Sequence, residues 1–187
     1  RTQFGLLTAA QIGALTTAQL QSLGTTAVSG LTGTQVLGLT ITQIASLDTT
    51  NVEALTTTAL AALSAVQLRA LSETNLKTLS TTQTQALTAT QIANLTTTQV
   101  GALDTTDIAD LTTTQFKALT APQIKVLSTE AIENLTTTQV AGLTSVQLGA
   151  LTETQLDALT EASFAELTST QAKGFSTTQL ASLDSTQ

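Results

Sequence analysis

The sequence of 187 residues lacks several side chains on which enzyme chemistry commonly depends. It contains no Cys, Met, Trp, Tyr or His, and it has only one Pro and four Phe. Without His and Cys the chain can form neither a Ser-His-Asp triad nor a Cys nucleophile, and it has neither the usual zinc ligands nor a disulfide framework. These absences predict a protein that is not an enzyme and has no catalytic residues, cofactor or metal site.

Charged residues are also scarce, at 10% of the chain, and the net charge is −7. Nucleic-acid binding needs a basic surface and commonly uses aromatic stacking, so the composition argues against a nucleic-acid partner. The apolar residues never form a run of the roughly 18 positions that a membrane span needs, which argues against membrane insertion. With 41% hydrophobic residues and a single Pro, the composition is typical of a folded chain.

What the sequence has instead is an eight-residue repeat without insertion or deletion. Leu recurs at every eighth residue from Leu7 to Leu183, with Phe175 as the one exception, and this defines 23 octads. If Leu is position one, position six is apolar in nearly every octad, with Thr84 and Ala172 as exceptions, and position eight is mostly small. The consensus is L-T-T-T-Q-h-x-A, where h is an aliphatic residue.

This period does not fit one continuous helix. An α-helix turns about 100° per residue, so its apolar stripe would move by about 80° with each octad and soon circle the helix. Position two is Ser, Thr or Asp in every octad except that of Gly24, and position five is Gln in 16 of the 23 octads. That spacing is a capping box, in which both side chains satisfy backbone N–H groups at a helix start. Each octad therefore predicts one short helix of about six or seven residues.

The residues that carry this prediction form two sets. The predicted helix-capping residues are Thr8, Thr16, Asp48, Asp104, Thr136, Gln11, Gln35, Gln99 and Gln139. The predicted core residues are Leu15, Leu55, Leu95, Leu135, Ile12, Ile92 and Val140. Five of the six basic residues occupy position seven, in the last helical turn, where a cation interacts favourably with the helix dipole.

Isolated short helices are unstable in water, so the octads must stabilise one another by stacking. We therefore predict an all-α solenoid or superhelix. Position six does not alternate between odd and even octads, which favours single octads spiralling round an axis over a zigzag of helical hairpins. A β-solenoid is the alternative, since Thr also favours strands. Residues 1–187 are expected to form one continuous array of about 23 octads, and the lack of polar capping repeats suggests part of a longer array or ends that stack on other copies.

Three features have both a functional and a structural interpretation, and for each the structural one is favoured. Asp104, Asp107 and Asp110 form the densest acidic cluster, but their spacing lacks the glycine turn of a calcium loop. Asn94 and Asn134 stand in N-glycosylation patterns, which arise whenever Asn at position eight precedes Leu-Thr. Thr rows at positions three and four offer hydroxyls to ice, glycan or a mineral surface, but β-branched residues also pack along a first helical turn.

The octad from Leu135 to Gly142, LTTTQVAG, resembles the Thr- and Gln-rich repeat tracts of very large bacterial secreted and cell-surface proteins, and the likeness extends over essentially the whole chain. The resemblance implies an extracellular or cell-surface location and a structural or adhesive role, and it implies no catalytic residues. We expect a rod, stalk or filament whose copies self-associate through their ends or lateral faces. A protein- or peptide-binding solenoid and a Thr-array binder of ice or glycan are the alternatives.

Overall fold

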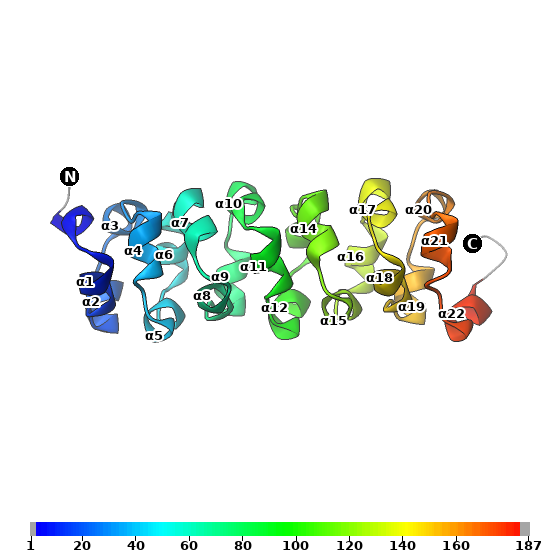
Figure 1. Ribbon diagram of the computed structural model, residues 1–187, viewed down its shortest axis with the longest axis horizontal. Helices are drawn as coiled ribbons and strands as arrows, with labels where there is room; N and C mark the ends of the chain where they lie inside the picture. Colours follow the sequence, from blue (N-terminus) through cyan, green and yellow to red (C-terminus); the bar gives the residue numbers. More distant parts are fainter. Residues whose placement is uncertain (1–2, 184–187) are drawn as a thin grey trace. The chain divides into compact units, whose positions relative to one another are not determined.

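The computed structural model describes residues 3–183, which form short α-helices joined by brief extended connections (Figure 1). The chain divides into two compact units, unit 1 (Arg1–Leu95) and unit 2 (Thr96–Gln187). Between residues 3 and 183 there is one α-helix per octad and no strand. The predicted all-α fold is therefore confirmed, and the alternative β-solenoid is wrong.

Unit 1 begins with a 3-10 helix, η1 (Gln3–Leu6), and continues with α-helices. In chain order these are α1 (Ala9–Gly13), α2 (Thr17–Gln21), α3 (Thr25–Ser29), α4 (Gly33–Leu37), α5 (Ile41–Ala45), α6 (Thr49–Ala54), α7 (Thr57–Ala62), α8 (Ala65–Arg69), α9 (Glu73–Lys77), α10 (Thr81–Ala86) and α11 (Ala89–Ala93).

Unit 2 continues the same pattern. Its described helices are α12 (Thr97–Ala102), α13 (Thr105–Ala109), α14 (Thr113–Ala118), α15 (Ala121–Lys125), α16 (Thr129–Glu133), α17 (Thr137–Ala141), α18 (Ser145–Gly149), α19 (Glu153–Asp157), α20 (Glu161–Ala165), α21 (Ser169–Ala172) and α22 (Thr177–Ser182). None of the helices between residues 3 and 183 has both the length and the apolar character needed to cross a membrane.

The octad sequence sets where each helix begins and ends. Thr16, at position two, has an extended backbone (φ −71°, ψ 157°), and its side chain accepts a hydrogen bond from the N–H of Gln19. Leu55, at position one, returns to an extended backbone (φ −64°, ψ 132°) and ends α6. Because residues at these two positions leave the helical conformation, the helices have only four to six residues. The predicted length of six or seven residues is therefore wrong for most of them.

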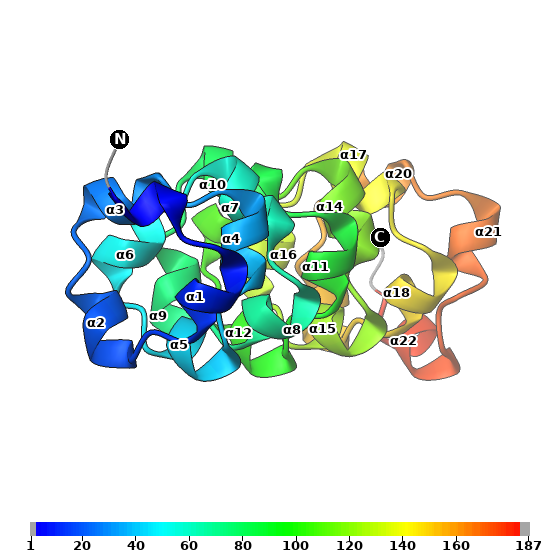
Figure 2. The ribbon, with the colours of Figure 1, turned by 60° about the vertical axis from the view of Figure 1, so that its left-hand side comes forward.

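Within each unit, a helix packs against the helix three octads earlier in the chain. In unit 1, α4 packs on α1, α5 on α2 and α6 on α3. In unit 2, α16 packs on α13, α17 on α14 and α18 on α15. Three octads, or 24 residues, therefore make one superhelical turn, and each unit carries three columns of stacked helices, which can be followed in Figures 1 and 2. This packing confirms the α-solenoid and the single-octad spiral.

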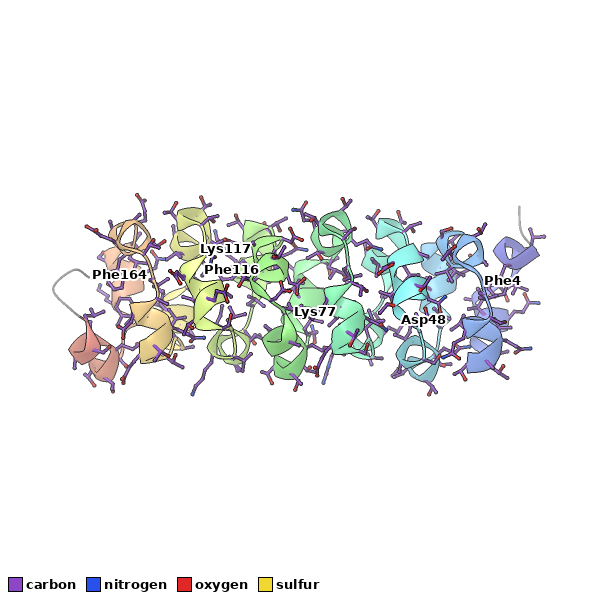
Figure 3. All side chains as sticks on the ribbon, turned by 180° about the vertical axis from the view of Figure 1, so that it is seen from behind. Phe4, Asp48, Lys77, Phe116, Lys117 and Phe164 are labelled. Atoms are coloured by element: carbon purple, nitrogen blue, oxygen red, sulfur yellow. The ribbon has the colours of Figure 1, made fainter. Side chains whose placement is uncertain are left out.

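The core of each unit is a narrow line of side chains from positions one and six. Most of the predicted core residues are at most 6% exposed: Leu55, Leu95, Leu135, Ile12, Ile92 and Val140. Leu15 differs from the prediction because it is only half-buried. It lies in the first superhelical turn of unit 1, where no described helix stacks on its N-terminal side. The largest fully buried side chain is Phe116, next to the exposed Lys117 on α14 (Figure 3).

Gly24 is the one described helix start without a side chain that can cap it. Its backbone (φ −68°, ψ 162°) matches that of the Thr caps, and no side chain accepts from the first turn of α3. We expect Gly24→Ser to raise the free energy of unfolding by about 0.5–1 kcal/mol, because it adds a cap and removes freedom from the unfolded chain. Urea denaturation followed by circular dichroism measures the change. Gly24→Ala is the control, since a Cβ there meets no atom within 4 Å but cannot accept a hydrogen bond.

Candidate functional site, a ladder of buried glutamines

The most regular buried polar side chain in the structure is the Gln at position five. Gln35, Gln99 and Gln139 are 5%, 4% and 4% exposed. A capping box on an isolated helix needs no such burial, because the side chain folds back over an exposed first turn. A buried amide is costly unless both its oxygen and its nitrogen are hydrogen-bonded. The bonds at both ends of this side chain therefore explain its place in the fold.

The amide oxygen is used within the octad. The Thr136 N–H donates to Gln139 Oε1 at 2.9 Å, and the Gln139 N–H donates to Thr136 Oγ1 at 3.2 Å. The same capping box recurs at many other helix starts, among them those of Thr8 with Gln11, Thr16 with Gln19, Thr32 with Gln35, and Thr96 with Gln99. At Asp48 and Asp104 a carboxylate takes the hydroxyl's place and accepts from the N–H groups of Asn51 and Asp107, respectively. The predicted capping residues thus lie at helix starts.

The amide nitrogen is used one superhelical turn earlier. Gln91 Nε2 donates to the carbonyl oxygens of Leu63 and Leu60, both at 2.8 Å. These carbonyls lie at the C-terminal end of α7, where the last carbonyls of a helix have no partner within it. One Gln side chain therefore caps the start of its own helix and the end of a helix in the preceding turn.

We call this set of side chains the glutamine ladder. Its members donate to the Leu carbonyl 28 residues earlier, in unit 1 from Gln35, Gln43, Gln67, Gln83 and Gln91, and in unit 2 from Gln139, Gln147, Gln155, Gln171 and Gln179. All of them are buried. The ladder thus holds successive turns together through polar bonds that water does not reach.

Asn at position five forms only part of the ladder, because its side chain is one methylene shorter. Asn75 Nδ2 reaches the carbonyl of Leu47 at 2.8 Å, but its octad has no capping box. Asn51 Nδ2 lies 3.5 Å from the carbonyl of Leu23, and the buried Asn51 Oδ1 has no hydrogen-bond partner among the described residues. Only the longer Gln side chain can therefore cap its own helix and also bond to the preceding turn.

A second contact between turns joins position eight, at the end of one helix, to position three, at the start of the helix one turn earlier. A Cβ added to Gly38 would lie 2.7 Å from Ala9 Cα and closer still to the Ala9 carbonyl. The backbone of Gly38 is in the right-handed helical region (φ −76°, ψ −16°), so the need for Gly is one of space and not of conformation. A Cβ on Gly30, also at position eight, meets atoms no closer than 3.4 Å.

This difference gives a paired prediction. We expect Gly38→Ala to lower the free energy of unfolding by about 1–3 kcal/mol, because backbone must move to admit the methyl group. Gly30→Ala, the matched control, should be neutral or stabilising by up to about 1 kcal/mol through its effect on the unfolded chain. Urea denaturation of both variants makes the comparison. Equal effects of the two substitutions would contradict the close approach of α4 to α1.

The other candidate features have structural partners. Asp104 accepts from the N–H groups of Thr106 and Asp107, so it acts as a helix cap. Between residues 3 and 183 no group of three or more acidic side chains is arranged to hold a metal ion. Asn94 Nδ2 donates to the carbonyl of Thr90, and Asn134 Nδ2 donates to that of Glu130, each at 2.8 Å. Both Asn side chains therefore cap the ends of their own helices.

The sequence predicted the capping half of the ladder and missed the bridging half. The sequence signal for the bridging bonds is that position five carries an amide and not a carboxylate. An isolated capping box accepts Glu as readily as Gln, and a negative charge is favourable at a helix start. Position five nevertheless holds Gln in 16 octads and Glu in none. A consistent preference for the neutral amide indicates that its N–H2 group has a partner.

Residues 100–137, which run from α12 to α17 in unit 2, match the ALTTAQ repeat family. The six letters of that name also occur outside the match, at residues 14–19, where they span position eight to position five of the octad. No curated protein matches the chain. The match supports a Thr-rich repeat protein, in agreement with the repeated helices of both units.

Proposed function

We propose that the chain is a non-enzymatic structural repeat protein, which forms a rod, stalk or filament and assembles by stacking and lateral contact of its repeats. The observation that carries this proposal is the glutamine ladder. In the ladder, the Gln at position five, which is the most regular buried polar side chain of the octad, joins one superhelical turn to the next by hydrogen bonds. Each added octad extends the array by the same rule, so length is the property that such a sequence controls most directly.

An extracellular or cell-surface location is part of the proposal. It rests on the resemblance of the octad to repeat tracts of large bacterial secreted and surface proteins. The composition supports it, because the chain has neither Cys nor Met, the two side chains that oxidants attack most readily. A structural polymer outside the cell gains from that resistance.

The proposal is tested by electron microscopy of the source cells with antibodies raised against the chain. We expect labelled fibres, stalks or a surface layer. Dispersed intracellular label would contradict the location, and monomers without any extended assembly would contradict the structural role. Solution scattering of chains with 12 and 24 added octads gives a second measure, because a spacer should lengthen in proportion to the number of octads. A plateau in the maximum dimension would argue against this role.

A protein-binding solenoid remains the second candidate, and one observation favours it. Ile41 on α5 and Val66 on α8 are 53% and 56% exposed on helices that pack together, and exposed apolar pairs of this kind are common at interfaces. Capture of one partner in fixed stoichiometry, lost in Ile41→Ser and Val66→Ser, would promote this function.

A Thr-array binder is the third candidate, based on Thr34, Thr58 and Thr82, which are exposed at position four of the stacked helices α4, α7 and α10.

A further inference from the structure

With three octads per turn, unit 2 sorts its charges onto different columns. The column of α13, α16 and α19 carries acidic side chains and no basic ones among its described residues. We call it the acidic face. Its carboxylates are Asp104, Asp107, Asp110, Glu130, Glu133, Glu153 and Asp157. Glu133 and Asp157 occupy position seven of successive turns, and both are exposed.

The column of α12, α15, α18 and α21 has the opposite character, and we call it the basic face. It exposes Lys125 and Lys173 at position seven, and its octads between residues 119 and 174 contain no acidic residue. It also exposes two aliphatic side chains, Val126 at 39% and Val146 at 69%. Cations beside exposed apolar side chains form a surface suited to an acidic protein partner.

We propose that the basic face of unit 2 docks on the acidic face of unit 2 in a second copy of this chain. The proposal deepens the structural role and rests on it, since it supplies the lateral contact through which copies assemble. Charge complementarity selects a second copy as the occupant. Like faces would place carboxylate against carboxylate or lysine against lysine, whereas unlike faces place Lys125 and Lys173 against a row of carboxylates. A contact between two different faces does not close on itself, so it adds copies without limit.

The strength of the contact must depend on salt. A single exposed ion pair stabilises a contact only weakly, so assembly requires both lysines acting together with the burial of Val126 and Val146. The net charge of −7 makes copies repel at very low salt. At about 0.1 M salt the screening length is about 10 Å, which weakens that repulsion while close pairs persist, and at about 1 M it falls to about 3 Å. Association is therefore expected near 0.1 M salt and should be weaker at 1 M.

Analytical ultracentrifugation of the full chain in NaCl tests the proposal. We expect concentration-dependent association at 0.1 M that falls at least tenfold at 1 M. Lys125→Glu with Lys173→Glu should reduce association at least tenfold at 0.1 M. Lys117→Glu is the matched control for each single substitution, Lys125→Glu and Lys173→Glu, because it makes the same charge change at position seven of α14, on the third column. It should reduce association less than twofold. An equal effect of the control, or no association of the unaltered chain, would overturn the proposal.

A second experiment restores the association by exchanging the charges of the two faces between two variants. The chain with Glu133→Lys and Asp157→Lys has lysine at these position-seven sites of both faces, and the chain with Lys125→Glu and Lys173→Glu has a carboxylate at these position-seven sites of both faces. Neither should associate alone, and an equimolar mixture should form alternating assemblies. Circular dichroism melting checks that each chain remains folded. Failure of the mixture would overturn the pairing of these faces. Extended labelled assemblies on the source cells would in that case still support the structural role, so the two proposals fail separately.

Discussion

Gln91→Glu is expected to lower the free energy of unfolding by about 3–5 kcal/mol at pH 7, because it leaves an uncompensated charge in the interior of unit 1. The Gln91 side chain is 3% exposed, and its Nε2 donates to two carbonyl oxygens at 2.8 Å. A carboxylate places an acceptor where those carbonyls need a donor. The Thr88 N–H, which donates to Gln91 Oε1 at 2.7 Å, can satisfy only one of its oxygens.

The loss should depend on pH in a defined direction. Burial beside carbonyl oxygens raises the pKa of the new carboxyl above the value of about 4.3 that it has in the unfolded chain. The folded state then holds the proton more tightly, so the stability of the variant relative to the unaltered chain falls as pH rises from about 4.3 through the folded-state pKa. Below about pH 4 the protonated acid donates one hydrogen bond again, and most of the lost stability should return.

Gln19→Glu is the matched control for this substitution. Gln19 is exposed in the first turn of unit 1, and its described hydrogen bonds lie within its own octad. Glu can form the same capping box and suits the helix dipole, so the change should be within about 0.5 kcal/mol of zero. Urea denaturation at pH 4 and pH 7 measures both variants, and hydrogen exchange of α7 and α11 locates the effect. Equal losses at the two positions would contradict the bridging role of the ladder.

Phe116→Ala is expected to lower the free energy of unfolding by about 3–5 kcal/mol, the usual loss when a buried aromatic ring is removed from a well-packed core. Phe116 is 0% exposed at position six of α14. The interior of each unit is only one line of side chains wide, so few neighbours can move to fill the cavity. Thermal and urea denaturation of the full chain measure the loss, with hydrogen exchange of α14 and α17 as the local readout.

Two further substitutions bracket this effect. Phe116→Leu should cost about 1–1.5 kcal/mol, because Leu keeps most of the volume and is common at position six. Phe164→Ala should cost less than Phe116→Ala, because Phe164 is half-buried, although its ring stacks on Phe175 with centroids 5.9 Å apart. A loss below about 1 kcal/mol for Phe116→Ala would show that the interior collapses freely around position six.

The capping boxes and most of the core could be predicted, because they depend on neighbours within one octad. Thr16 and Gln19 form their capping box three residues apart, so the spacing of two residue types was enough to predict it. Ile12 and Ile92 were predictable as core because each octad has few apolar side chains to bury. These features are local, and the strict period repeats each of them along the chain.

What escaped prediction depends on the number of octads per turn. That number decides that Gln91 meets the carbonyl of Leu63, that Gly38 approaches Ala9, and that the helices of Glu133 and Asp157 stack in one column. It follows from the bend between successive short helices, and no single octad encodes that bend in its residue types. The two-ended role of Gln and the charged faces of unit 2 therefore appear only when the turns are stacked.

The turn of three octads also constrains how copies of different length can coexist. Gaining or losing one octad leaves the ladder bonds in register, since most octads offer the same Gln donor and every octad offers the same backbone carbonyls. It nevertheless moves every later octad of that unit to the next column, so the acidic and basic side chains of those octads rotate about the superhelix axis by a third of a turn. Gaining or losing three octads returns these side chains to their original direction about the axis. Each added octad thus lengthens the array, and only the addition of three octads returns the charged side chains to their original columns. Copies whose octad numbers differ by a multiple of three therefore keep matching faces.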